Sequence, residues 1–217
     1  MSNPYFQFKQ FTVWHDKCAM KVGTDGVLLG AWTSVQGAHS ILDVGTGTGL
    51  VALMLAQRSL PNTNIVALEI DEAAAGQAKE NIVRSPWKKQ IEVVQADFRK
   101  YQSPEKFDVI VSNPPYFVDS LGCPDQQRNS ARHNDSLTYE ELLEGVTGLL
   151  TENGTFTIVI PMDVADRVKM IASEKKLQAV RQLNVITKPG GIPKRTLITF
   201  SFSNQECIVE ELSLIHI

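Results

Sequence analysis

The chain has 217 residues, of which 43% are hydrophobic and 21% are charged, and its formal net charge is −3 at pH 7. This length suits one α/β domain with a sizeable core, and the slight acidity argues against a protein that coats nucleic acid by bulk charge. The sequence contains no apolar run of membrane-spanning length and no signal-peptide pattern. Its three cysteines are widely spaced and its four histidines are scattered, which predicts free thiols in the cytoplasm and no metal site.

The first part of the chain predicts a small extension. Residues 6–13 place phenylalanine and valine among polar residues, a pattern typical of a strand or a short hairpin. An apolar stretch at 27–32 predicts a helix, which Thr24 or Asp25 could cap. Because this helix directly precedes the sheet, the same two side chains could instead line a ligand site. We expect residues 1–32 to pack as an extension on a single domain formed by residues 33–217.

A glycine-rich turn follows the first strand of that domain and leads into a helix. Gly45, Gly47 and Gly49 allow the backbone to come close to a ligand at the N-terminus of the helix. Their spacing differs from the G-x-G-x-x-G of dinucleotide-binding proteins, and Asp43 stands at the strand end before the first glycine. An acid there repels a pyrophosphate but can pair with a cation. The pattern therefore favours S-adenosylmethionine over NAD as the ligand.

Two further strands also end in acids. The strand at 64–71 ends in acids, and its Glu69 lies about 20 residues beyond the glycine turn, where nucleotide-binding folds place an acid on ribose hydroxyls. After a helix at 72–83, the strand at 91–97 closes on Asp97, which could accept a hydrogen bond from an adenine amino group. Each acid alone could be an ordinary surface carboxylate. Three acids at successive strand ends predict recognition of one ligand at this edge of the sheet.

The fourth strand, at 107–111, leads into Asn113-Pro114-Pro115-Tyr116. Two prolines cannot extend a strand, so the chain must turn stiffly at the edge where open α/β sheets bind ligands. The turn would present the Asn113 amide, the Pro114 carbonyl and the Tyr116 ring to a cleft. Two such oxygens can accept the N–H bonds of an amino group on a flat ligand while the ring stacks on its face. A plain structural turn is the alternative.

The rest of the chain completes the sheet and adds basic side chains. We predict a loop at 117–136, helices at 137–150 and 163–175, and strands at 154–160, 177–186, 195–202 and 207–214. The two strands on either side of the Pro-Gly-rich turn have no helix between them, so they should form an antiparallel hairpin. Basic residues either form a solvated surface or contact phosphates, and the candidates for contact are Arg128, Arg132, Lys194 and Arg195. Because the sequence stops in an apolar strand, we expect a truncated or foreign C-terminus.

The order of these motifs resembles that of class I S-adenosylmethionine-dependent methyltransferases that act on amino nitrogens. The motifs are the glycine turn with Asp43, then Glu69, Asp97 and the turn at Asn113–Tyr116. Within that class the whole chain, including residues 8–11, 15–26 and 85–87, is similar to the bacterial tRNA1(Val) adenine-37 N6-methyltransferases. The resemblance implies an α/β, Rossmann-like fold. Its sheet is mostly parallel and seven-stranded, ends in an antiparallel hairpin and carries helices on both faces.

The resemblance also implies roles for the residues around the cofactor, S-adenosylmethionine. Asp43 and the three glycines would border its methionine part, Glu69 would bind its ribose and Asp97 its adenine. Thr24 and Asp25 would approach its carboxylate end.

For the substrate, the resemblance implies that Asn113 and Pro114 hold the target amine and that Tyr116 stacks on the base. The expected reaction is methylation of adenine 37 in a tRNA by a cytoplasmic monomer that uses no metal. Other readings stay open at this point. They are methylation of a glutamine amide in a protein, of ribosomal RNA or of DNA adenine, and a cofactor-binding scaffold without activity of its own.

Overall fold

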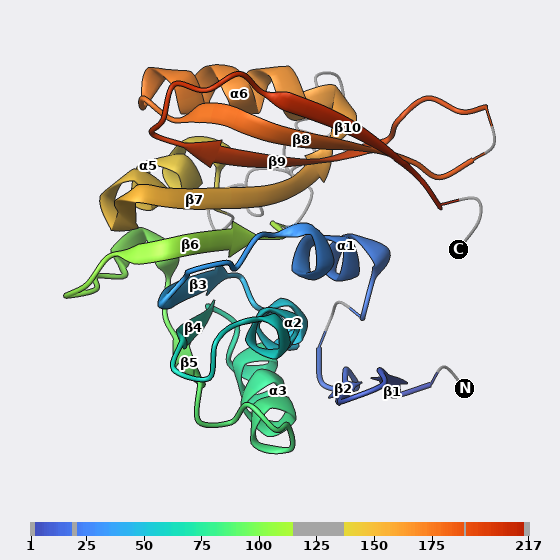
Figure 1. The fold of residues 1–217 in the computed structure, drawn as a ribbon. Coiled ribbons are helices and arrows are strands. Elements are labelled where there is room, and N and C mark those ends of the chain that lie inside the picture. Colours follow the sequence, from blue (N-terminus) through green and yellow to red (C-terminus); the bar gives the residue numbers. More distant parts are fainter. Residues whose placement is uncertain (1–2, 19–20, 115–136, 189, 215–217) are drawn as a thin grey trace, which may run out of the picture.

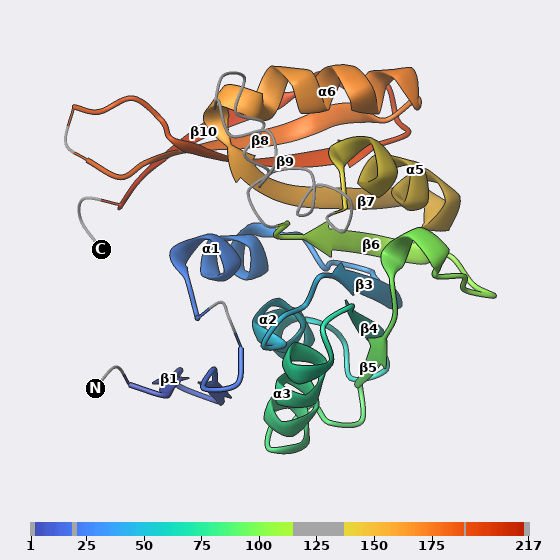
Figure 2. The same ribbon diagram turned by 180° about the vertical axis from the view of Figure 1, so that it is seen from behind.

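The computed structural model describes residues 3–18, 21–114, 137–188 and 190–214, which form a sheet with helices on both faces and a small N-terminal hairpin (Figures 1 and 2). The elements in chain order are β1 (Tyr5–Gln7), β2 (Thr12–Trp14), α1 (Thr24–Trp32), β3 (Ser40–Val44), α2 (Leu50–Arg58), β4 (Asn64–Glu69), α3 (Glu72–Val83), β5 (Ile91–Gln95), η1 (Phe98–Lys100), β6 (Phe107–Ser112), α5 (Tyr139–Leu149), β7 (Leu150–Pro161), η2 (Met162–Val164), α6 (Ala165–Glu174), β8 (Gln178–Ile186), β9 (Arg195–Ser201) and β10 (Ile208–Ser213).

Within the described residues the main sheet has eight strands in the order β10-β8-β9-β7-β6-β3-β4-β5. The strands β5, β4, β3, β6 and β7 are parallel to one another. β9 lies antiparallel between β7 and β8, which confirms the predicted hairpin. β10 pairs in parallel with β8 at the outer edge (Figure 1). The sheet therefore has one strand more than the seven that the resemblance implied.

The strand directions bring several chain turns to one edge of the sheet. The carboxyl ends of the parallel strands β3, β4 and β6 lie there together. Because β9 is antiparallel to both of its neighbours, β8 ends and β9 begins at that same edge. The glycine turn, the residues after β6 and the connection at 187–194 are thus close in space although they are far apart in sequence.

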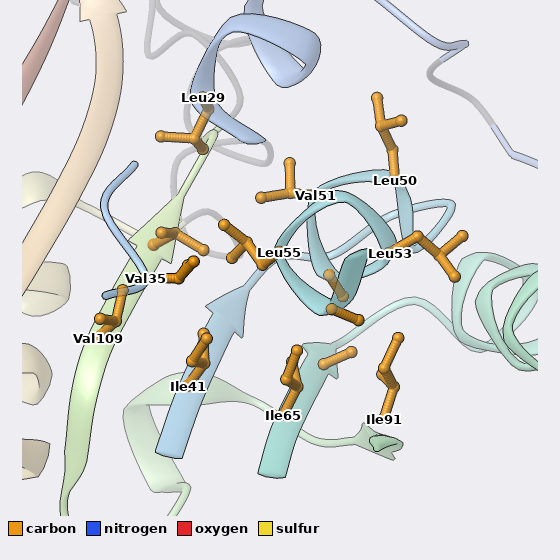
Figure 3. Close-up of a cluster of buried hydrophobic side chains, with 14 of the residues drawn as sticks. Leu29, Val35, Ile41, Leu50, Val51, Leu53, Leu55, Ile65, Ile91 and Val109 are labelled. Carbon is orange, nitrogen blue, oxygen red and sulfur yellow. The ribbon is translucent and has the colours of Figure 1, made fainter. Parts of the chain in front are cut away.

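Two apolar clusters cover the two faces of the sheet. On β3, Ile41 belongs to the cluster beneath α1 and α2, shown in Figure 3, whereas the next residue, Leu42, belongs to the cluster beneath α5 and α6. Both faces of each central strand are therefore buried, which explains their nearly continuous apolar sequences. The N-terminal residues Phe11 and Val13 and Leu29 of α1 share the first cluster. The boundary at residue 32 stays a prediction.

Two local predictions are wrong. Neither Thr24 nor Asp25 caps α1, because the helix begins at Thr24 and Gly23 occupies the N-cap without a side-chain hydrogen bond. The Asp25 carboxylate instead contacts Arg195. The strand expected at 154–160 is longer, since β7 begins at Leu150, directly after α5.

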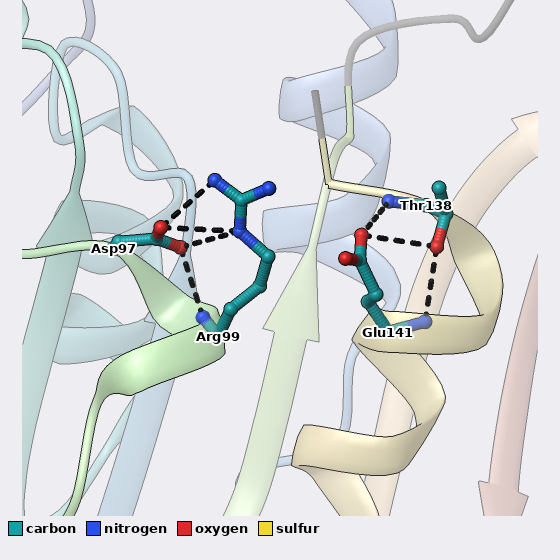
Figure 4. A network of polar contacts seen from close by, with 4 residues as sticks. All are labelled: Asp97, Arg99, Thr138 and Glu141. Carbon is teal, nitrogen blue, oxygen red and sulfur yellow. Dashed lines mark hydrogen bonds and ion pairs between the residues drawn. The ribbon is translucent and has the colours of Figure 1, made fainter. Parts of the chain in front are cut away.

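A capping box fixes the start of α5 (Figure 4). The Thr138 hydroxyl accepts a hydrogen bond from the backbone N–H of Glu141, and the Glu141 carboxylate accepts one from the N–H of Thr138 at 2.8 Å. These two bonds satisfy N–H groups that a helix N-terminus otherwise leaves open. In the described part of the chain, no helix has the length and the apolar character needed to cross a membrane.

Candidate cofactor and substrate site

A cavity of about 670 Å³ lies at the edge of the sheet where the strand ends meet. Residues of α1, the glycine turn, the end of β6 and the β8–β9 connection line it. Its walls include nine of the residues singled out from the sequence, which are Thr24, Asp25, Asp43, Gly45, Gly47, Asn113, Pro114, Lys194 and Arg195. The fold thus brings one N-terminal pair, two strand ends and a distant basic pair to a single cavity.

The glycine turn adopts a backbone that favours glycine. Gly45, Gly47 and Gly49 have φ of 72°, 57° and 81°, in the left-handed region where other residues are strained. A Cβ added at Gly45 or Gly47 would meet no atom within 4 Å, so the turn leaves open space beside its backbone. The N–H groups of Gly45 and Thr46 both donate to the carbonyl of Leu68 at 2.9 Å, which ties the turn to β4.

The Asp43 carboxylate is buried and borders the cavity. Its Oδ2 accepts hydrogen bonds from the Thr46 hydroxyl at 2.6 Å and from the Ala52 N–H at 3.1 Å. Burial raises the pKa of Asp43 from 3.8 to about 7, although these two hydrogen bonds favour the ionised form. A cation in the cavity would stabilise the ionised carboxylate, so the site suits a positively charged ligand.

Glu69 is also buried, and it holds backbone groups together at the end of β4. Its Oε2 accepts a hydrogen bond from the Gly47 N–H at 2.8 Å, and its Oε1 accepts from the N–H groups of Ile70 at 2.9 Å and Asp71 at 3.0 Å. The carboxylate therefore fixes the position of the glycine turn relative to β4. Its predicted contact with a ribose stays a prediction.

Asp97 lies after β5, where its carboxylate meets Arg99 (Figure 4). The Arg99 side chain donates to both oxygens, with Nη2 at 2.8 Å from Oδ2 and Nε at 2.9 Å from Oδ1. This hydrogen bonding by Arg99 lowers the pKa of Asp97. An adenine amino group at this position would have to share the carboxylate with the guanidinium.

Asn113 and Pro114 follow β6 and line the cavity, and their predicted contact with an amine stays a prediction. The Ser112 hydroxyl donates to the carbonyl of Val44 at 3.0 Å, which joins the ends of β6 and β3 just before Asn113. Helix α1 lies close by, because a Cβ added at Gly26 would be 3.8 Å from the Asn113 amide nitrogen. The predicted roles of Tyr116, Arg128 and Arg132 concern positions outside the described residues.

The chain also matches a known protein family over most of its length. The profile described as "Methyltransferase small domain" matches residues 22–187, which include all the residues that line the cavity except Lys21, Lys194, Arg195 and Leu214. The chain belongs to this methyltransferase family. The match confirms the class of enzyme that the sequence predicted.

Relatives of this methyltransferase carry a more specific name. A tRNA1(Val) (adenine(37)-N6)-methyltransferase from Bacteroides thetaiotaomicron is 81% identical over 98% of this chain and 90% of that protein. A protein of the same name from Bacteroides fragilis is 67% identical over 98% of this chain and 90% of that protein. Another, from Yersinia pestis, is 44% identical over 96% of this chain and 85% of that protein.

Solved structures share the fold of the methyltransferase at low sequence identity. A predicted O-methyltransferase from Agrobacterium tumefaciens superimposes with a TM-score of 0.69 at 17% identity, covering 89% of this chain and 88% of that chain. A glycopeptide N-methyltransferase complexed with S-adenosylmethionine gives 0.61 at 12% identity, covering 83% of this chain and 93% of that chain. These matches confirm the predicted class I methyltransferase fold.

Sequence reasoning missed several residues that line the methyltransferase cavity, among them Lys21, Thr46 and Thr187. Thr46 stands between two predicted glycines, so its position in the turn was a usable signal. Thr187 reaches the cavity because β8 ends at this edge, which requires the antiparallel placement of β9. Among the described residues, no group of three or more histidine, cysteine or acidic side chains could hold a metal ion.

Proposed function

We propose that the chain transfers a methyl group from S-adenosylmethionine to the exocyclic N6 of adenine 37 in tRNA1(Val). The observation that carries this proposal is the 81% identity, over 98% of the chain, to a protein named for that reaction. The relative at 44% identity bears the same name, so the name is shared across distant members. Such an enzyme works where tRNA is found, in the cytoplasm, and we propose that it acts as a monomer.

The residues around the cavity fit S-adenosylmethionine. The buried Asp43 carboxylate suits the cationic methionine part, and the open space beside Gly45 and Gly47 admits a ligand close to the backbone. Glu69 at the end of β4 would bind the ribose, and Asp97 after β5 would bind the adenine. Thr24 and Asp25 line the same cavity and would lie near the carboxylate end. When bound, the cofactor supplies an electrophilic methyl group.

The target amine needs positioning, because its lone pair is delocalised into the adenine ring. The Asn113 side-chain oxygen and the Pro114 carbonyl would accept its two N–H bonds, draw the nitrogen toward tetrahedral geometry and aim the lone pair along the line of transfer. Both residues line the cavity that also contains Asp43. Holding two reactants in line can be worth effective molarities up to about 10⁸ M in model systems, so no strong general base is needed.

The base must leave its stack to reach Asn113, and an anticodon loop offers unstacked purines at low cost. Tyr116 would stack on the exposed base, and Arg128 and Arg132 would contact phosphates. Lys194 and Arg195 line the same cavity, and Arg195 also contacts Asp25 through Nε at 3.3 Å from Oδ2. We propose that these two residues contact a nearby RNA phosphate.

The test is transfer of radiolabelled methyl groups from S-adenosylmethionine to unmodified bulk tRNA, followed by nucleoside analysis. We expect label in N6-methyladenosine. A tRNA1(Val) transcript with guanine at position 37 is the matched control and should accept no label. Absence of label from all RNA, in a protein that still binds the cofactor, would refute the proposal. It would direct attention first to glutamine amides in proteins and then to a scaffold role.

A further inference from the structure

The side of α3 that faces the glycine turn carries a buried amide, Asn81, which is only 1% exposed. Its Oδ1 accepts a hydrogen bond from the N–H of Trp14 at 2.9 Å, and its Nδ2 donates to the carbonyl of Trp14 at 2.8 Å. The same nitrogen donates at 2.8 Å to the carbonyl of Thr48, inside the glycine turn. One side chain therefore joins the N-terminal hairpin to the turn that borders the cofactor cavity.

The N-terminal segment continues along α3 toward the end of β4. The N–H of Lys17 donates at 3.0 Å to the side chain of Gln77, one helical turn before Asn81. Cys18 then lies near Glu69 and Asp71, whose charges contribute to the raised pKa of its thiol. Residues 14–18 thus pass beside the acid that holds the Gly47 N–H.

Helix α3 supports the end of the glycine turn in two ways. α3 touches its end, because a Cβ added at Gly49 would lie 3.4 Å from the Cβ of Ala78. The carbonyl of Thr48, however, is fixed by Asn81. A buried polar group that loses its hydrogen-bond partner keeps the full cost of its desolvation. Removal of the Asn81 side chain would leave the Thr48 carbonyl and the backbone N–H and carbonyl of Trp14 without these bonds.

We propose that Asn81 is a positioning residue for the cofactor, which sets the glycine turn through Thr48 and couples it to residues 14–18 through Trp14. The proposal uses the proposed function only in taking S-adenosylmethionine as the ligand. Gln77 provides a matched control on the same helix face. It is fully buried and bonds the same N-terminal segment, but no hydrogen bond joins its side chain to the glycine turn in the described residues.

The experiment compares Asn81→Ala with Gln77→Ala by calorimetric titration of S-adenosylmethionine in the absence of RNA, and by steady-state kinetics. We expect Asn81→Ala to weaken cofactor binding about tenfold or more, while kcat at saturating cofactor changes less than about threefold. Gln77→Ala should stay within about twofold of the parent protein in both quantities. Equal weakening by the two variants, or no weakening by Asn81→Ala, would overturn the proposal.

Hydrogen exchange tests the coupling even where the variants fold poorly. Coupling between two sites is reciprocal, so the cofactor should slow exchange of the Trp14 amide hydrogen in the unmodified protein. If the Trp14 amide hydrogen exchanges at the same rate with and without the cofactor, the proposal is wrong. Because the calorimetric titration and the hydrogen exchange contain no RNA, a wrong substrate assignment would leave these two results unchanged.

Discussion

Asp43 should make cofactor affinity depend on pH. Burial raises the pKa of this carboxyl to about 7, and only the ionised form can attract a cationic ligand. At about one pH unit below that pKa, roughly nine-tenths of the carboxyl is protonated in the free protein. If the bound cation keeps the carboxylate ionised, the apparent Kd at about pH 6 should be roughly tenfold higher than at about pH 8.

The variant Asp43→Asn separates the charge from the hydrogen bonds. The asparagine oxygen can still accept from the Thr46 hydroxyl and the Ala52 N–H, the two donors that Oδ2 of Asp43 uses. The turn should therefore keep its geometry while the charge disappears. An ion pair at about 4 Å near a protein surface is worth up to roughly 4 kcal/mol, so cofactor binding at about pH 8 should weaken at least tenfold. In this variant the cofactor affinity should no longer depend on pH.

The same variant should stabilise the free protein at high pH. The folded-state pKa of Asp43 lies above its ordinary value of 3.8, so its contribution to stability is fully present below about pH 4 and is lost as the pH rises through about 7. Since one pKa unit corresponds to about 1.36 kcal/mol, the ionised carboxylate costs the free protein roughly 4 kcal/mol. Asp43→Asn removes this cost at about pH 8 and changes little at about pH 4.

Calorimetric titration between about pH 6 and 8 measures the affinity, and urea unfolding without cofactor measures the stability. If the cofactor affinity of the parent protein does not change over this pH range, the ionisation assigned to Asp43 is wrong. A variant that retains the parent's pH dependence would show that another group titrates. A variant that is destabilised at about pH 8 would show that the carboxylate carries a structural role that charge burial does not explain.

Three further predictions concern catalysis and stability. Asn113→Ala should lower kcat about 100-fold or more while the cofactor Kd measured by calorimetry stays near the parent value, and a lost cofactor affinity would undo the role of the amide. Gly145→Ala should lower the free energy of unfolding measured in urea, because the new Cβ would lie 2.5 Å from the Phe98 ring. In Gly148→Ala, in the same helix, the new Cβ would meet no atom within 4 Å, so the free energy of unfolding should rise by up to about 1 kcal/mol. Equal effects of the two alanines would contradict this packing. Thr138→Ala should cost about 1 kcal/mol of unfolding free energy through the lost capping box, with methyl transfer unchanged, and unaltered stability would show that the cap is dispensable.

The central strands were predictable because they are buried on both faces, so their apolar runs stand out from the helices between them. The hairpin of β8 and β9 was also predictable, since the turn at 187–194 has no room for a crossover helix. The first residues of β7 were not, because they follow α5 without a break. The cap of α1 was misjudged because a local pattern cannot show that Asp25 has a partner 170 positions away in Arg195.

The candidate site followed from the rule that parallel strands end at one edge, which is why Asp43 and Asn113 could be placed together before any coordinates were known. The hydrogen-bond partners of the side chains at that edge could not be predicted from the sequence. Nothing in the sequence requires Arg99 to bond both oxygens of Asp97, since a side chain two residues away can adopt many rotamers. The contribution of Asn81 was equally hidden, because its partners are backbone groups in two separate segments.

The carboxylates beside Cys18 have a consequence for redox chemistry. Burial, together with Glu69 and Asp71, raises the pKa of the Cys18 thiol to about 11. Peroxides and electrophiles react with the thiolate, which at neutral pH then amounts to a fraction on the order of 10⁻⁴. The sulfur beside these carboxylates is thereby kept in its protonated, less reactive form. The acid expected to hold a ribose therefore also contributes to the low reactivity of its neighbour toward oxidants.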